Sequence, residues 1–561
     1  MPVTLTYPGV YVEEIPSGVR TVTGVATSIT AFIGRALRGP VNKATTINSF
    51  GDFERIFGGL WTTSSLGYAV RDFYLNGGSQ AVIVRLYHAE SGQNAKASKS
   101  KVTAGTVELE AAYEGKWGAN LRASVDVDVS ADVAQRMGLT KADLFNLTVR
   151  DAGPNIITER YLNVSYKNSP RRVDNVLEGE SKLVRWDNAS PLNPNNPPAI
   201  TADSDAVTKA EKTLADALRA VPQVPADITA AQIALNLAKK AMDDAVSNGS
   251  DLTKGDDFTP PNAEANKKGL YALEQVFARD GLFNILCIPP YLSTGDVNVS
   301  LISDAAAYCE RRRAMLIVDP PSDWKDKTTA HDKFADPNTD NVGTRSRNAA
   351  LFFPRLRQPN PLHDNQIEEF VPCGAVAGIF ARTDTQRGVW KAPAGLDASL
   401  VGVPQLSVPL TDDENGELNP LGINCLRAFP IAGRVVWGAR TLRGADQLAD
   451  EYKYVPVRRT ALYIEESLYR GLKWVVFEPN DEPLWAQIRL NAGAFMQNLF
   501  RQGAFQGSSP RDAYFVKCDK ETTTQNDINL GIVNIVVGFA PLKPAEFVVI
   551  KLQQMAGQIE A

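Results

Sequence analysis

The sequence lacks an apolar run of the roughly 18 residues that a membrane-spanning helix needs. Its first residues also lack the basic and apolar segments of a secretory signal peptide. We therefore expect a protein that is made in the cytoplasm and stays there unless it leaves as part of a larger particle. The net charge of −5 argues against nucleic acids and direct membrane binding, because anionic partners attract basic surfaces.

Residues that bind metals or catalyse reactions are few and scattered. The sequence has only three histidines, and none has the spacing of a metal-binding helix. No P-loop motif, strand–GxGxxG–helix unit or Gly-x-Ser-x-Gly elbow is present. The five cysteines form no Cys-x-x-Cys pair and are best interpreted as small core residues; they are Cys287, Cys309, Cys373, Cys425 and Cys518. We expect no cofactor and no bound metal.

Two aspartates, Asp319 and Asp384, are the candidates for a catalytic role. Asp319 follows an apolar run, and α/β enzymes place active groups at the carboxyl ends of such strands. No general acid, nucleophile or metal ligand accompanies it in the sequence. Capping or turn formation is therefore the better interpretation of Asp319.

The composition is that of a globular protein, with 44% hydrophobic and 22% charged residues, and 561 residues predict two to four domains. Apolar runs at Phe283–Tyr291 and Ala314–Pro321 predict buried strands, and Val297–Arg313 between them predicts a helix. This order predicts a parallel strand–helix–strand unit. We expect a multidomain α/β and α+β fold, with mixed sheets and flanking helices.

Residues 91–265 have a different character. Alternating segments such as Leu121–Val129 and Leu144–Val149 predict strands, and a proline-rich linker follows at 190–198. Two alanine-rich stretches, 204–220 and 227–247, predict a helical hairpin. We expect the two helices to face each other through Leu214, Leu218, Ile233, Leu237 and Ala241.

The C-terminal quarter alternates between helix and strand patterns. Trp474–Phe477 predicts a short strand, and Asp481 is a good N-cap for a long helix after it. The apolar runs 531–539 and 546–552 predict two further strands. Strands this apolar at the end of a chain need partners on both sides.

Apolar and polar residues alternate over residues 1–20, with a break at Pro8-Gly9. This pattern is typical of an edge strand or of a strand added to another sheet. A first strand of the local domain explains it equally well.

Several blocks resemble the contractile tail sheath proteins of phage tails, R-type bacteriocins and phage-tail-like injection systems. These blocks include Tyr7–Glu14, Asn284–Tyr291, Ala377–Pro393 and Ser467–Trp485. The resemblance covers about 1–90 and 266–561 and is weak between them. It implies a structural assembly protein rather than an enzyme.

The resemblance also implies a division of the chain. We expect an N-terminal arm (1–20), a first part of the sheath core (21–90), a variable outer insertion domain (91–265), a second part of the core (266–395), an inner C-terminal domain (396–527) and a C-terminal arm (528–561).

In sheaths of this kind, arms from neighbouring subunits extend the sheet of the C-terminal domain and link the subunits into a mesh. The resemblance assigns this role to Val3, Leu5, Tyr7, Val10, Tyr11, Val12, Ile532, Val533, Ile535, Val537, Phe547 and Val549. It also implies that the long C-terminal helix faces an inner tube, here through Gln487, Arg489, Asn491, Gln497, Asn498 and Arg501.

The function implied by the resemblance is mechanical. Copies would stack as rings into a helical sheath around an inner tube, together with baseplate and terminator or cap proteins. Contraction of a metastable sheath would then drive the tube through a target envelope without nucleotide hydrolysis. Two alternatives remain open on the sequence, a cytosolic α/β enzyme and a non-contractile self-assembling shell protein.

Overall fold

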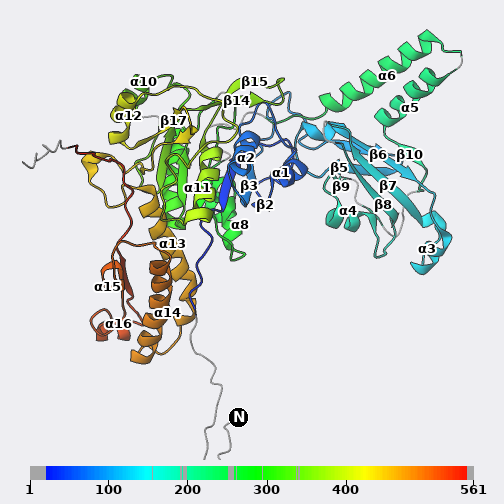
Figure 1. Cartoon of the computed structure of the whole chain (residues 1–561). Helices are drawn as coiled ribbons and strands as arrows, with labels where there is room; N and C mark the ends of the chain where they lie inside the picture. Colours follow the sequence, from blue (N-terminus) through cyan, green and yellow to red (C-terminus); the bar gives the residue numbers. More distant parts are fainter. Residues whose placement is uncertain are drawn as a thin grey trace, which may run out of the picture.

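The central element of the fold is an eight-stranded mixed sheet with helices on both faces (Figure 1). The computed structural model describes residues 21–153, 156–189, 192–193, 199–220, 222–249, 258–260, 262–293, 295–336, 338 and 342–552. The expected N-terminal arm (1–20) and most of the proline-rich linker (190–198) therefore lie outside the described residues.

The strands of the sheet follow the order β18-β17-β13-β12-β11-β1-β3-β2. All neighbours from β17 to β3 are parallel, and the two outer strands, β18 and β2, run antiparallel to theirs. The strands are β1 (Thr30–Gly34), β2 (Thr45–Ile47), β3 (Ala81–Arg85), β11 (Ile285–Cys287), β12 (Met315–Val318), β13 (Ala349–Phe353), β17 (Ile423–Phe429) and β18 (Gly433–Val436).

Each face of the sheet has its own hydrophobic core. One face is covered by α8 (Glu274–Phe277), α9 (Val299–Arg312), α10 (Lys327–Ala335) and α12 (Asp412–Leu418). The other is covered by α1 (Phe50–Phe57), α2 (Leu66–Leu75) and α11 (Cys373–Arg387). The predicted strand–helix–strand unit is confirmed, because β11 and β12 are parallel neighbours joined through α9. A small sheet of β14 (Leu356–Asn360), β15 (Gln366–Phe370) and β16 (Gln405–Leu406) lies beside the core.

Most of the segment between β3 and α7 (Ala263–Asn266) forms a separate lobe with its own cluster of buried residues (Figure 1). It contains a three-stranded sheet of β4 (Lys101–Ala104), β5 (Val107–Ala111) and β9 (Val184–Trp186), and a four-stranded sheet of β10 (Asp203–Ser204), β6 (Leu121–Asp126), β7 (Leu144–Asp151) and β8 (Ile157–Ser165). The short helices α3 (Ala131–Arg136) and α4 (Val173–Glu180) lie between strands of the lobe, whereas α7 contacts the 3₁₀ turn Gly269–Leu273 beside the central sheet. A buried ion pair of 2.5 Å between Arg38 and Asp151 ties this lobe to the central sheet.

The predicted helical hairpin is confirmed as α5 (Ala206–Arg219) and α6 (Pro225–Asp244), which project from the lobe (Figure 1). The predicted contact face is wrong. Ile233 and Leu237 are 54% and 62% exposed, whereas Ala231 and Leu235 are the buried residues of α6. The helix therefore packs through the opposite side from the one that its largest apolar residues suggest.

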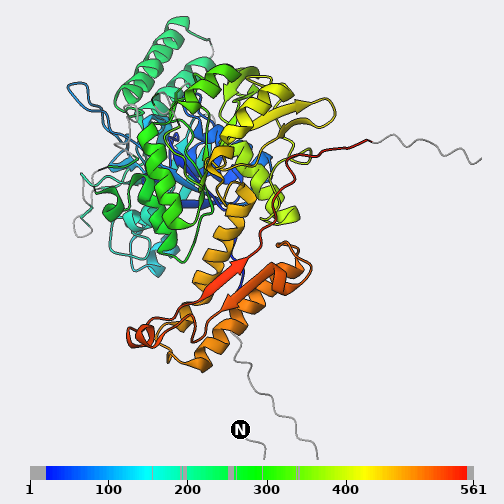
Figure 2. The same cartoon turned by 90° about the vertical axis from the view of Figure 1, so that its left-hand side faces the viewer.

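The C-terminal part extends from the central sheet as a helix pair with a two-stranded ribbon (Figures 1 and 2). The pair is α13 (Val455–Gly471) and α14 (Glu482–Arg501), and the ribbon is β19 (Tyr514–Lys517) and β20 (Val536–Phe539). Two short helices, α15 (Pro510–Ala513) and α16 (Gln525–Asn529), lie close to the ribbon. No helix among the described residues is long and apolar enough to cross a membrane.

One strand prediction is wrong here, and another stays a prediction because its expected partners belong to neighbouring copies. Trp474 lies in a 3₁₀ turn (Lys473–Val475) between the two antiparallel helices, and Phe477 has a φ of 70° and an exposed side chain, so no strand forms at 474–477. The run 546–552 forms no strand within the described residues. The earlier run is a strand only over Val536–Phe539.

Candidate inter-subunit interface

The helix pair is built around a well-defined start of α14. The Asp481 carboxylate accepts a hydrogen bond from the Glu482 amide at 2.7 Å, as predicted for its N-cap, and Pro483 occupies the first turn. The Trp485 ring packs against the ribbon side and its Nε1 donates to Asn480 Oδ1 at 2.9 Å. The apolar side of α14 is thereby fixed against α13 and the ribbon, which leaves the opposite side of the helix uncovered.

The six residues predicted to face a tube do not share one side of α14. Gln487, Asn498 and Arg501 are exposed. Asn491 is only 1% exposed, and its Oδ1 has no hydrogen-bond partner among the described residues.

Arg489 and Gln497 are partly buried by contacts inside the chain. Arg489 donates to the carbonyl oxygen of Cys518 and to Glu482, and Gln497 accepts from the Tyr514 hydroxyl at 2.8 Å. Two further residues lie on the uncovered side of α14 with the exposed polar ones. They are Leu490, which is 56% exposed, and Ala494.

The ribbon of β19 and β20 covers α14 with one face only. Val516, Val537 and Phe539 pack toward the helix pair, whereas Phe515 and Val536 are 49% and 44% exposed. Within the described residues each strand pairs only with the other, so one edge of each carries unpaired backbone groups. Such edges accept a further strand.

Of the predicted arm residues, Ile532, Val533 and Ile535 precede β20 and Val537 lies within it. Val533 and Ile535 pack against α14 in the same chain. This part of the predicted C-terminal arm therefore belongs to the subunit's own fold.

The last described residues are different. Phe547, Val548, Val549, Ile550 and Leu552 are 74–94% exposed. Folded proteins do not keep consecutive large apolar side chains in water without a partner, and this row is a marker of an interaction site. The segment leaves the fold as a single extended chain (Figure 2).

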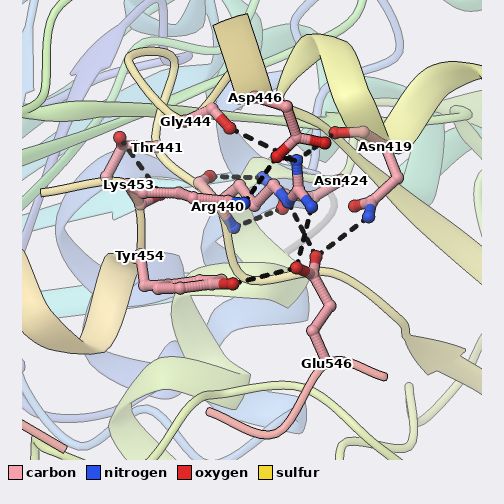
Figure 3. Close-up of polar contacts among 9 residues, drawn as sticks. All are labelled: Asn419, Asn424, Arg440, Thr441, Gly444, Asp446, Lys453, Tyr454 and Glu546. Carbon is pink, nitrogen blue, oxygen red and sulfur yellow. Dashed lines mark hydrogen bonds and ion pairs between the residues drawn. The ribbon is translucent and has the colours of Figure 1, made fainter. Parts of the chain in front are cut away.

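Glu546 fixes the point at which this segment leaves. Arg440 donates through Nε and Nη2 to the two carboxylate oxygens of Glu546, each at 2.7 Å (Figure 3). Asn419 Nδ2 and the Tyr454 hydroxyl also donate hydrogen bonds to the Glu546 carboxylate, at 2.9 and 3.0 Å. The Arg440 side chain is fully buried, and its Nη1 also meets Asp446 at 3.1 Å. Bidentate pairing of this kind is among the stronger polar contacts in proteins.

The electrostatics of this anchor favour the charged carboxylate. Burial alone would raise the pKa of Glu546, but the hydrogen bonds from Arg440 and Asn419 outweigh it and hold that pKa below the ordinary value. Sequence reasoning missed the anchor. Its only sequence signal is a lone acid between the apolar residues Ala545 and Phe547.

The two candidate catalytic aspartates have structural partners. Asp319 Oδ1 accepts a hydrogen bond from the Cys373 amide at 2.8 Å, at the start of α11, while burial raises the pKa of Asp319 to about 6. Asp384 forms a buried ion pair with Arg459, with contacts of 2.6 and 2.8 Å. A cavity of about 300 Å³ lies beside Asp319, lined also by Tyr291 and Arg355. The Arg355 guanidinium donates to the carbonyl oxygen of Pro320 at 3.0 Å and to Asp296 Oδ1 at 2.6 Å.

Comparison with known proteins places these features in a family. Residues 264–442 match the model of the phage tail sheath protein central domain, and residues 449–554 match that of the phage tail sheath C-terminal domain. Together the two matches span just over half of the chain.

Three curated relatives are tail sheath proteins. The chain is 30% identical to that of Vibrio phage KVP40 over 137 residues, and 25% identical to that of Enterobacteria phage T4 over 168 residues. These matches cover 24% and 29% of this chain but only 20% and 24% of the two phage proteins. A putative prophage major tail sheath protein of Pseudomonas aeruginosa is 25% identical over 289 residues, which are 51% of this chain and 68% of that protein.

Solved structures share the fold over nearly the whole chain. The helical sheath of the anti-feeding prophage in its contracted state matches with a TM-score of 0.54 at 21% identity, covering 98% of this chain and all of that chain. A sheath tail protein of Listeria innocua matches with a TM-score of 0.56 at 13% identity, covering 93% and 96%. The chain therefore belongs to the contractile tail sheath family of structural proteins.

Proposed function

We propose that this protein is the structural subunit of a contractile sheath, which polymerises around an inner tube and contracts to drive that tube through a target envelope. The observation that carries the proposal is the row of exposed apolar residues from Phe547 to Leu552, held out from the fold by Glu546. Exposed apolar side chains do not stabilise a subunit that stays alone. They stabilise an assembly when they are buried against a neighbouring subunit.

Neighbouring copies connect by strand exchange in this proposal. Residues 547–552 of one copy add to an open edge of the β19–β20 ribbon of a second copy, and residues 3–12 of a third copy add to the other edge. Backbone hydrogen bonds hold the added strands, and the apolar side chains give them register. Because the added strands lie in the terminal segments and not in the folded parts, the folded parts can rotate without breaking the connections.

The uncovered side of α14 is the surface that we assign to the inner tube. Gln487, Asn498 and Arg501 lie there with Leu490 and Ala494, so the contact is mixed and mainly polar. A weak polar contact suits a tube that must later slide free. Asn491, Arg489 and Gln497 support the helix from inside the subunit and are not part of this surface.

The lobe at 91–265 faces outward in this proposal, since it projects from the central sheet in a different direction from the α13–α14 pair (Figure 1). Baseplate and cap proteins hold the two ends of the sheath. Assembly takes place in the cytoplasm, and the product is part of a virion or a tail-like particle.

The protein acts without catalysis in this scheme. Contraction releases free energy stored at assembly, because new interfaces form between subunits. A gain of a few kcal/mol per subunit, repeated over many subunits, exceeds the free energy of most single binding events. No group on the chain needs to hydrolyse a nucleotide.

Electron microscopy of the particle before and after mild acid or denaturant tests the proposal. We expect long sleeves around a tube that become shorter and wider and leave the tube bare. A protein that stays monodisperse and never tubular, even with its neighbouring gene products present, would contradict the proposal.

A further inference from the structure

The cavity of about 300 Å³ beside Asp319 lies at the carboxyl ends of the parallel strands β11 and β12. Its walls come from the loop after β11, the start of α9, the loop after β12, and Arg355. Open α/β sheets place their ligand sites outside the carboxyl ends of parallel strands, and the volume suits a small ligand. Neither the proposed strand exchange nor the proposed tube contact uses these residues.

Most of the cavity wall is apolar. Prolines and Tyr291 line it together with aliphatic side chains from β12, from the loop after β11 and from the first turns of α9. The aliphatic residues include Ile288, Val299, Ile302, Leu316 and Val318. A wall of this kind stabilises a short alkyl chain by removing it from water.

Arg355 is the one cation that lines the cavity within the part of the chain that the structure describes, and its charge is already paired. Its Nη2 meets Asp296 Oδ1 at 2.6 Å, and its Nε donates to the Pro320 carbonyl oxygen at 3.0 Å. Asp296 also accepts hydrogen bonds from the amide and the hydroxyl of Ser322, each at 2.7 Å. An anionic ligand would therefore find no free cation here and would be repelled by Asp296 and Asp319.

The carboxyl group of Asp319 has no such partner. Its Oδ1 accepts from the Cys373 amide at 2.8 Å, whereas its Oδ2 is buried and has no hydrogen-bond partner among the described residues. Burial raises the pKa of Asp319 to about 6, although contacts with Cys373 and the charge of Arg355 oppose the rise. Near neutral pH the group is still mainly ionised, so an unpaired negative charge lies beside an aliphatic wall.

The chemistry of the cavity selects among cations. Ca²⁺ and Mg²⁺ need several oxygen ligands, and no group of three or more His, Cys, Asp or Glu side chains in the described ranges could hold a metal ion. An organic cation needs only one acceptor for its N–H groups and an apolar surface for its carbon chain. Asp319 Oδ2 supplies the acceptor, and the aliphatic wall supplies the surface.

We propose that the cavity binds a short-chain alkylammonium ion, with the ammonium group donating to Asp319 Oδ2 and the alkyl chain lying against Ile302 and Val318. The bound ion gives the buried carboxylate the positive charge that the chain itself does not provide. This site is independent of the proposed sheath function, and the outcome for one does not decide the other.

Three matched ligands test the site by isothermal titration calorimetry of the full-length protein at pH 7. Butylammonium, 1-butanol and butyrate have similar alkyl chains and differ in charge. We expect butylammonium to bind at least about tenfold more tightly than butanol, and butyrate to bind more weakly than butanol. Butanol that binds as tightly as butylammonium, or no saturable binding of butylammonium up to about 50 mM, would overturn the inference.

Asp319→Asn keeps the size of the side chain and removes its charge. We expect this variant to lose at least about tenfold in butylammonium affinity and to keep its butanol affinity within about twofold, which shows that the cavity is intact. Asp132→Asn removes one exposed charge on α3 and is the matched control, which should bind like wild type. Unchanged butylammonium affinity in Asp319→Asn would contradict the proposed contact.

The pH dependence of binding needs no variant. Alkylammonium ions stay charged at both pH 5 and pH 7, whereas Asp319 is mostly protonated at the lower value and mostly ionised at the higher. The ionisable groups that interact with Asp319 are Cys287, Asp296, Arg355 and Cys373. We expect butylammonium to bind about tenfold more weakly at pH 5 than at pH 7, with butanol binding unchanged. Equal affinity of butylammonium at the two pH values would overturn the inference.

Discussion

Arg440 and Glu546 are 106 residues apart in the sequence, and the buried guanidinium of the first binds both carboxylate oxygens of the second. The pair joins the loop after β18 to the C-terminal segment (Figure 3). It therefore divides the C-terminal quarter into a part that belongs to the subunit, up to Glu546, and an apolar part beyond it that has no partner in the same chain.

Replacing Glu546 by Gln should destabilise the folded subunit. The Arg440 charge would stay fully buried, with Asp446 as its remaining acid, so we expect a loss of about 2–3 kcal/mol in the free energy of unfolding. Urea unfolding measures it. The exposed Glu521→Gln is the control and should change stability by less than about 0.5 kcal/mol. A loss that small in the Glu546 variant would mean that the pair does not hold the segment.

The contribution of Glu546 should depend on pH. Its pKa is lowered in the folded state, so its stabilising effect is complete above the ordinary glutamate value of 4.5 and is lost as the pH falls through the lower, folded value. The stability difference between wild type and Glu546→Gln should thus be constant from pH 6 to 8 and shrink below about pH 4. A stability difference between the two proteins that grew as the pH fell would contradict the lowered pKa of Glu546.

The ionised Asp319 carboxylate should destabilise the fold, so its effect on stability has the opposite pH dependence to that of Glu546. Its folded pKa is raised to about 6 from 3.8, so the folded state binds a proton that the unfolded state has already lost, and stability falls as the pH rises between these values. Asp319→Asn keeps an acceptor for the Cys373 amide and removes the buried charge. We expect this variant to be more stable than wild type by about 1–3 kcal/mol at pH 7 and to lose that advantage near pH 4. Thermal unfolding at the two pH values measures it.

The crossing of α2 and α11 depends on glycine. A Cβ added at Gly374 would lie 2.0 Å from the Ala69 carbonyl oxygen, so Gly374→Ala must push the two helices apart. We expect a loss of about 2–3 kcal/mol in the free energy of unfolding. Gly493→Ala in α14 is the matched control. A Cβ there meets nothing within 4 Å, and the change should stabilise the helix by about 0.5–1 kcal/mol. Equal effects at the two sites would contradict the packing described for α2 and α11.

The sequence predicted those parts of the fold in which local pattern and tertiary environment agree. The apolar runs that became β11 and β12 are buried on both faces, and Asp481 caps α14 through a bond to the next residue. Such features depend on neighbours in the sequence or on burial alone, and both can be read without a structure.

The errors occur where tertiary context decides. Trp474–Phe477 is as apolar as a strand, but this segment must turn the chain between two antiparallel helices, and a 3₁₀ turn forms at Lys473–Val475. On α6 the larger residues Ile233 and Leu237 predicted the packed face, whereas Ala231 and Leu235 are the residues that are buried. The Arg440–Glu546 pair could not be predicted, because nothing local connects two charged residues so far apart.

The candidate interface was predicted in outline only. The row at 546–552 was recognised as strand-like, but a strand needs hydrogen-bond partners, and the single chain offers none within its described residues. The domain boundaries at 20, 90, 265, 395 and 527 and the arm residues from Val3 to Val12 stay predictions.

A cryo-electron microscopy map of assembled sleeves tests the central claim most directly, through the path of residues 547–552. The account predicts that this segment leaves its own subunit after Glu546 and pairs as a strand with the β19–β20 ribbon of a second copy. A segment that folds back onto its own subunit, with no chain crossing between copies, would contradict it.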